Sequence, residues 1–254
     1  MDTTGWAGGG GPDHLWLYLE PEDGKAVSFR KRRLFVVAMC RRLWNVYQDE
    51  RSRTAVEVAE RYADGLASED ELGEAYRVAN SPEVLNKPST PLKREKQSKR
   101  PAGKGRAAQA RRAKAAAETL AWHLHFAAQA AAGSAIKNDD LVYGFHHITN
   151  TLALLDEAEI YQLHSDLLKE MFWDHHPVVL DEPRVTFDPK WRSDTALSLA
   201  RHIYQSRDFA QMPILADALQ DAGCDNADIL NHLRDPDATH VRGCWALDLV
   251  LGKE

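Results

Sequence analysis

Apolar side chains recur at intervals of three and four residues through most of the chain, the spacing that places them on one face of an α-helix. The first such run predicts a helix over residues 31–47, in which Val36, Cys40, Leu43 and Tyr47 share a face and arginines fill the remainder. Most of the chain follows this period, so the pattern indicates a helical protein.

The same spacing predicts further helices over residues 55–62, 68–79, 106–132, 148–173, 195–205 and 212–222. Ser68 stands three residues before Glu71, the arrangement of a capping box. Gly65 and Gly223 stand where left-handed caps end helices, and Pro213 lies where a first turn tolerates proline. Asp225 is predicted to cap a further helix in "NADILNHL", and Pro236 lies just beyond that helix.

Two short segments do not show the helical period. Residues 177–188 contain valines and two prolines, which is typical of an ordered loop with at most a small hairpin. Residues 244–252 are too short and too uniformly apolar to distinguish helix from strand, although their helical surroundings favour helix. The predicted fold is therefore all-α, or nearly so, in the form of an irregular multi-helix bundle.

Composition adds a domain plan to this fold. The glycine-rich opening predicts a flexible lead-in over residues 1–28, followed by a single helical domain over 29–254. The 254 residues include 44% hydrophobic residues, enough for a core, and the net charge is −6. Three cysteines and the lack of a long apolar run favour a soluble cytoplasmic protein with no membrane partner.

A basic linker or insertion is expected to interrupt the domain at about residues 87–110. Residues 87–114 hold six Lys and five Arg against one Glu, a local balance of +10, which leaves −16 for the rest of the chain. The segment is interpreted first as a solvated linker. Binding of nucleic acid or another polyanion is the alternative, with phosphate contacts from Lys93, Arg94, Lys96, Lys99, Arg100, Lys104, Arg106, Arg111 and Arg112.

The C-terminal region carries the candidate chemistry in Cys224, His232, His240 and Cys244. Thiolate and imidazole are donors that zinc prefers, but the spacing lacks the close pairs of common zinc motifs. A second interpretation makes Cys244 a nucleophile beside a histidine. The favoured interpretation treats the cysteines as small buried residues, so that no cofactor is expected and zinc is the alternative.

Three further histidine pairs, at 123 and 125, 146 and 147, and 175 and 176, raise the same question of a metal site. The chain has no His-Glu-x-x-His, no phosphate-binding glycine loop and no Gly-x-Ser-x-Gly turn. These histidines are therefore interpreted as surface or interface residues.

Two stretches, "KRRLFVVAMCRRLWNVYQDERSRTAVEVAERYADG" and "MPILADALQDAGCDNADILNHLRDPDATHVRGCWALDLVLGKE", resemble the ends of a family of uncharacterised bacterial proteins that often occur as many paralogues. The resemblance implies a shared fold, with no catalytic residue to carry over. It favours a non-catalytic helical interaction or regulatory module with a protein partner, in which the two terminal segments pack together. The alternatives are a metal-binding protein or Cys/His enzyme, and a polyanion-binding protein.

Overall fold

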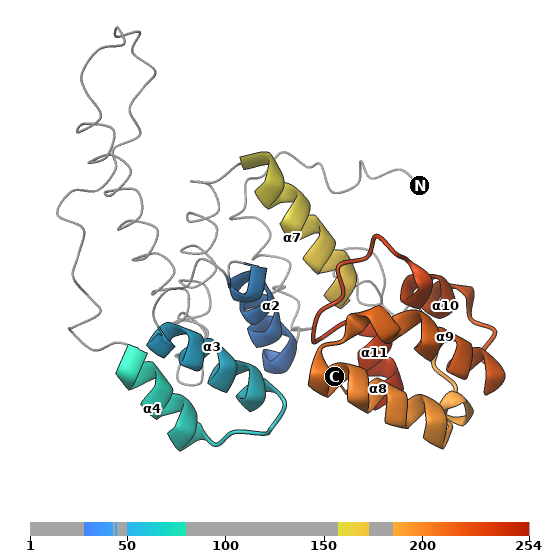
Figure 1. The fold of residues 1–254 in the computed structure, drawn as a ribbon, viewed down its shortest axis with the longest axis horizontal. Coiled ribbons are helices and arrows are strands. Elements are labelled where there is room, and N and C mark those ends of the chain that lie inside the picture. Colours follow the sequence, from blue (N-terminus) through green and yellow to red (C-terminus); the bar gives the residue numbers. More distant parts are fainter. Residues whose placement is uncertain (1–27, 43, 45–49, 80–156, 173–184, 254) are drawn as a thin grey trace, which may run out of the picture. The chain divides into compact units, whose positions relative to one another are not determined.

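The computed structural model describes residues 28–42, 44, 50–79, 157–172 and 185–253. Within these ranges the chain forms eight α-helices and no strand, which confirms the predicted all-α fold (Figure 1). The helices are α2 (Phe29–Arg42), α3 (Glu50–Ala63), α4 (Glu69–Ala79), α7 (Glu157–Phe172), α8 (Asp194–Ser206), α9 (Met212–Asp221), α10 (Ala227–Arg234) and α11 (Trp245–Leu251).

The chain divides into two compact units. The C-terminal unit combines Met1–Ala38 with Ala158–Glu254, and the middle unit is Met39–Glu157. The predicted single domain over residues 29–254 stays a prediction. The flexible lead-in, the basic segment and the helix predicted over 106–132 lie outside the described residues.

In the middle unit, α3 and α4 pack side by side (Figure 1). Ala55 and Ala59 on α3 and Leu72 on α4 are fully buried, because the helical period places them on the apolar faces of the two helices. Ser68 caps α4 as predicted, because its Oγ accepts a hydrogen bond of 3.1 Å from the Glu71 amide, while the Glu71 carboxylate pairs with Arg61. Gly65 has a positive φ of 70°, as expected of a left-handed residue between two helices.

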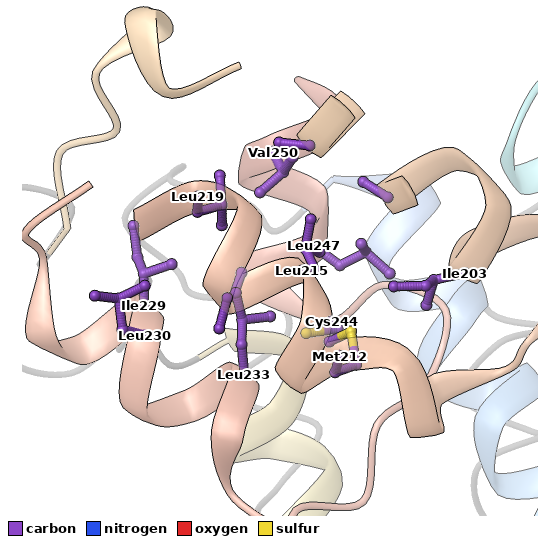
Figure 2. Close-up of a cluster of buried hydrophobic side chains, with 14 of the residues drawn as sticks. Ile203, Met212, Leu215, Leu219, Ile229, Leu230, Leu233, Cys244, Leu247 and Val250 are labelled. Atoms are coloured by element: carbon purple, nitrogen blue, oxygen red, sulfur yellow. The ribbon is translucent and has the colours of Figure 1, made fainter. Parts of the chain in front are cut away.

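In the C-terminal unit, α8, α9, α10 and α11 enclose one hydrophobic cluster (Figure 2). Each helix contributes a stripe at the predicted spacing, for example Met212, Leu215 and Leu219 on α9. Because each fully buried aliphatic side chain contributes about 1.5–3 kcal/mol, the cluster accounts for the packing of these four helices. The segment 244–252 joins it as α11, so helix is the correct choice there.

The helix ends of this unit follow the predicted signals with one correction. Pro213 lies in the first turn of α9, and Gly223 adopts a positive φ of 90° just after it. The cap of α10 is Asn226 and not Asp225: the Asn226 Oδ1 accepts a 3.1 Å bond from the Ile229 amide. The helix begins at Ala227, so only the residue directly before it can reach that amide.

Other boundaries shift modestly. The helix predicted over 31–47 ends at Arg42 in the described residues, and the described part of the helix predicted over 148–173 begins at Glu157. Of the possible hairpin at 177–188, the described residues 185–188 form no strand and lead into the 3₁₀ turn η2 (Pro189–Trp191). The remainder of that hairpin lies outside the described residues.

The start of α2 meets the last helix of the chain. Asp248 on α11 is 2% exposed and accepts two bonds from Arg30, of 2.8 and 3.0 Å, while Lys31 Nζ lies 2.8 Å from the same carboxylate. The start of α2 is thus tied to α11, while the packing of the two terminal segments as one domain stays a prediction. The contact also brings Lys31 to two main-chain oxygens, those of Met171 on α7 and Gly243 before α11.

Candidate metal centre

Four potential metal-ligating side chains converge in the C-terminal unit. Glu170 lies on α7, His232 on α10, His240 on the loop after α10, and Cys244 at the start of α11. Each offers one donor atom, and the four atoms all lie within 4.8 Å of one another. Four donors at this separation surround a volume suited to a single ion.

The donor atoms also contact one another directly. His232 Nε2 lies 3.3 Å from Cys244 Sγ and 3.3 Å from Glu170 Oε2, and His240 Nδ1 lies 3.0 Å from Glu170 Oε1. The two imidazole rings are nearly perpendicular, at 84°, with centroids 5.1 Å apart. The carboxylate thus bridges both histidines, and the thiol approaches from α11.

Local sequence positions each histidine donor. His232 occupies the last turn of the short α10, whose Ile229 and Leu233 are buried in the hydrophobic cluster. Its ring packs against Trp245, with centroids 4.9 Å apart. His240 lies beside Phe209, with ring centroids 6.5 Å apart. Aromatic contacts of this kind restrict ring orientation.

Gly243 brings the Cys244 donor close to α7. Its φ of 92° belongs to the left-handed region, and a Cβ there would lie 2.7 Å from Met171 Cε. A side chain at this position would therefore be strained and would also press on α7. The glycine thus permits close packing of the Met171 side chain over the residue that precedes Cys244.

The site is buried, and burial disfavours charge on its side chains. Glu170 is 3%, His240 7% and His232 16% exposed, and Cys244 is fully buried. Burial lowers the pKa of His232 more strongly than the nearby Glu170 carboxylate raises it. Burial also raises the pKa of the Cys244 thiol well above its usual value, and the Glu170 charge acts in the same direction.

These directions bear on the two chemical alternatives. A cysteine nucleophile needs thiolate character and access, whereas the shifted pKa of Cys244 favours the buried, protonated thiol. A divalent cation reverses that preference, because coordination deprotonates a thiol outright. Neutral imidazoles are also the form in which histidine binds a metal. The group is thus better suited to metal binding than to nucleophilic catalysis.

Three of the four candidate residues predicted from the C-terminal sequence come together: His232, His240 and Cys244. Cys224 does not join them. It is buried in the hydrophobic cluster at the turn after α9, where desolvation raises its pKa. Glu170 stands as the fourth donor, and the sequence analysis missed it.

The signal for Glu170 is an acidic residue on an apolar helix face. Leu163, Leu167 and Glu170 fall at the helical spacing of four and three, and all three are buried. A carboxylate on a buried face is rare unless it is paired or binds a metal. The nine basic candidates between Lys93 and Arg112 and the other three histidine pairs lie outside the described residues.

A cavity of about 390 Å³ adjoins the metal-ligating group. Glu170 and His232 lie in its wall together with Trp245. Most of its charged lining is acidic, contributed by Asp166, Asp228, Asp235 and Asp237. None of these four aspartates belongs to the metal-ligating group.

Fold and site together define a helical protein with a candidate metal centre. Comparison of the chain with protein-family models, curated proteins and solved structures found no match. Among the described helices, none has the length and apolar character to cross a membrane. The functional argument therefore rests on the side chains of the metal-ligating group.

Proposed function

We propose that the protein binds one divalent transition-metal ion, zinc by its donor set, through Glu170, His232, His240 and Cys244. The observation that carries this proposal is the convergence of four donor atoms within 4.8 Å. They belong to three helices and a loop, so their meeting depends on the tertiary fold. Imidazole, thiolate and carboxylate are the ligand types typical of protein zinc sites.

Charge balance supports a divalent ion. A thiolate from Cys244 and a carboxylate from Glu170 supply two negative charges, and two neutral imidazoles supply none. A divalent cation bound among them gives a neutral centre, which lowers the cost of burying it. A lone proton or a monovalent ion would leave a buried negative charge uncompensated if both anionic ligands stayed ionised.

The number of ligands supports a structural role. Four protein ligands close the tetrahedral shell that zinc adopts in structural sites, whereas catalytic sites keep a position for water or substrate. The ion would therefore stabilise the C-terminal unit, and the protein would be non-catalytic. A structural metal site is compatible with an interaction or regulatory module. That module stays a prediction, because none of the contacts among the described residues identifies a partner.

The test is the metal content of the full chain, purified without chelator and measured by elemental mass spectrometry. We expect about one zinc ion per chain in the wild type, and a strong loss in Cys244→Ser because the thiolate ligand is removed. Cys224→Ser is a matched control, since it alters another buried cysteine of the same hydrophobic cluster. It should retain the metal.

Two results would contradict the proposal. One is a wild-type chain that holds no zinc, cobalt or other divalent ion even after refolding with the metal. The other is equal metal loss in the Cys224→Ser and Cys244→Ser variants while both remain folded by circular dichroism, which would place the metal elsewhere or make the loss nonspecific.

A further inference from the structure

We propose that metal loading controls how firmly α7 is held against α10 and α11, so that the metal centre acts as a clamp between α7 and the C-terminal helices. This inference rests on the proposed metal site. It assigns a regulatory role to that site, in which metal occupancy is converted into the docking of one helix.

The hydrophobic cluster of the C-terminal helices is formed by α8 to α11 and the segments around them. Its described members all lie between Val185 and Val250, and none of the α7 side chains that the structure describes is among them. The four helices therefore have a core of their own. What fixes α7 against them must come from contacts outside that cluster.

The donors are divided unequally between these two parts. His232, His240 and Cys244 all lie within residues 232–244, on segments that the hydrophobic cluster positions. Glu170 alone comes from α7. Three ligands can hold an ion without α7, and the docking of α7 then supplies the fourth. Docking and metal affinity must consequently strengthen each other by the same factor, because coupling between two equilibria is reciprocal.

Electrostatics gives the coupling its direction. An ion held by one thiolate and two neutral histidines carries a net positive charge in a buried place, which the Glu170 carboxylate neutralises on docking. Without the ion, the same carboxylate is buried beside two imidazoles and a thiol, none of which is a permanent cation. A buried carboxylate without a fixed cation beside it is costly, so the metal-free protein should hold α7 less firmly.

Other contacts limit the movement. Lys31 Nζ donates to the carbonyls of both Met171 and Gly243, at 3.1 and 2.7 Å, and so joins α7 to the start of α11 independently of the metal. The Met171 side chain also packs closely over Gly243. Metal release should therefore loosen α7 locally and leave the fold of α8 to α11 in place.

Hydrogen–deuterium exchange on the full chain tests the clamp, with zinc-loaded protein compared with protein stripped by chelation and dialysed. We expect the amides of residues 163–172 to exchange about 5- to 150-fold faster without zinc, the range typical of coupling between sites. Amides of α8 and α9 should change much less, and they serve as the internal measure of an intact fold.

Two variants on the same helix sharpen the test. Glu170→Ala should bind zinc more weakly, and at saturating zinc its α7 amides should exchange as fast as those of the stripped wild type. Asp166→Asn removes a carboxylate one turn earlier, from the cavity wall, and should keep both the zinc and the zinc-dependent protection of α7.

The outcomes separate the two proposals. Zinc that binds without altering the exchange of residues 163–172 would overturn the clamp and leave the metal site intact. Equal acceleration over α7, α8 and α9 would also overturn it, because the metal would then support the whole unit uniformly. A wild-type chain that binds no zinc would remove both proposals.

Discussion

Two buried carboxylates in the C-terminal unit have opposite surroundings. Asp248, 2% exposed on α11, lies against the full cations of Arg30 and Lys31 and needs no further partner. Glu170, 3% exposed on α7, lies against two histidines and a thiol, none of which is a permanent cation. The two carboxylates are therefore buried to a similar extent, but within the described part of the chain only Asp248 lies beside arginine and lysine side chains that balance its charge.

The difference separates a structural ion pair from a ligand site. A buried charge persists when it is paired or when it coordinates a metal. Asp248 satisfies the first condition with residues of the chain itself, and the bidentate Arg30 contact adds hydrogen bonds to the charge pairing. The ion pairs that Glu170 forms with described residues include no such arginine or lysine. The side chains beside it are two histidines and a cysteine, which are residue types that bind metal ions. The contrast is itself an argument for the ion.

Asp248→Asn should have the largest effect on stability and little effect on metal binding. It leaves Arg30 and Lys31 beside a neutral amide, and breaking a buried ion pair costs about 3–5 kcal/mol. Denaturant unfolding of the full chain measures the loss, and elemental analysis of the folded fraction should still find zinc. A variant that loses its zinc while it remains folded would show that the two carboxylates are not independent.

Removal of zinc should give the next largest effect. A ligand that binds only the folded state stabilises it by about 2.7 kcal/mol at a free concentration of 100 times its Kd. The thermal midpoint should therefore rise with zinc concentration in the wild type, and this dependence should be lost in His232→Ala. A midpoint that does not respond to zinc in a metal-binding wild type would mean that the ion also binds the unfolded chain.

The effect of Glu170→Gln on the free energy of unfolding should be opposite in the zinc-loaded and the zinc-free protein. This variant therefore tests the comparison of the two carboxylates directly. In zinc-loaded protein the variant loses an anionic ligand, so the zinc affinity and the stability that zinc confers should both fall. In stripped protein it removes a buried charge that lacks a strong cation, so stability should be equal to or higher than that of the wild type. Parallel unfolding curves with and without zinc measure both values.

A loss of stability in both states would contradict that prediction, because the carboxylate would then be adequately compensated by the two histidines alone. Asp248→Asn is the reference, since it should destabilise both states equally. The pair of variants therefore measures the role of the metal as a difference between two carboxylates of similar burial.

Local signals predicted most of the described fold. The period of three and four residues gave the helices, Ser68 gave a cap, and the glycines at 65 and 223 gave left-handed ends. These features depend on neighbours within one or two turns, which a sequence displays directly. The cap of α10 was missed by one residue, since adjacent Asp and Asn have similar capping preferences.

The candidate site depended on distant contacts and was predicted only in part. His232, His240 and Cys244 lie on one short stretch, so their residue types pointed to them without knowledge of the fold. To predict that Glu170 is a donor and that Cys224 is not, one must know which face of α7 meets the loop between α10 and α11. Donor spacing in sequence resembles no common zinc motif, because tertiary packing supplies the fourth ligand.

An exposed ion pair of the middle unit gives the smallest expected effect and completes the comparison. Arg61 and Glu71 join α3 to α4 with side chains 41% and 43% exposed. Exposed pairs contribute about 0.2–1 kcal/mol, because water already solvates both charges. Glu71→Gln should therefore shift the unfolding midpoint slightly, and less so at high salt. A loss of unfolding free energy in Glu71→Gln as large as that in Asp248→Asn would contradict this expectation. Burial would then not explain why the carboxylates of the C-terminal unit matter more for stability than exposed acidic residues do.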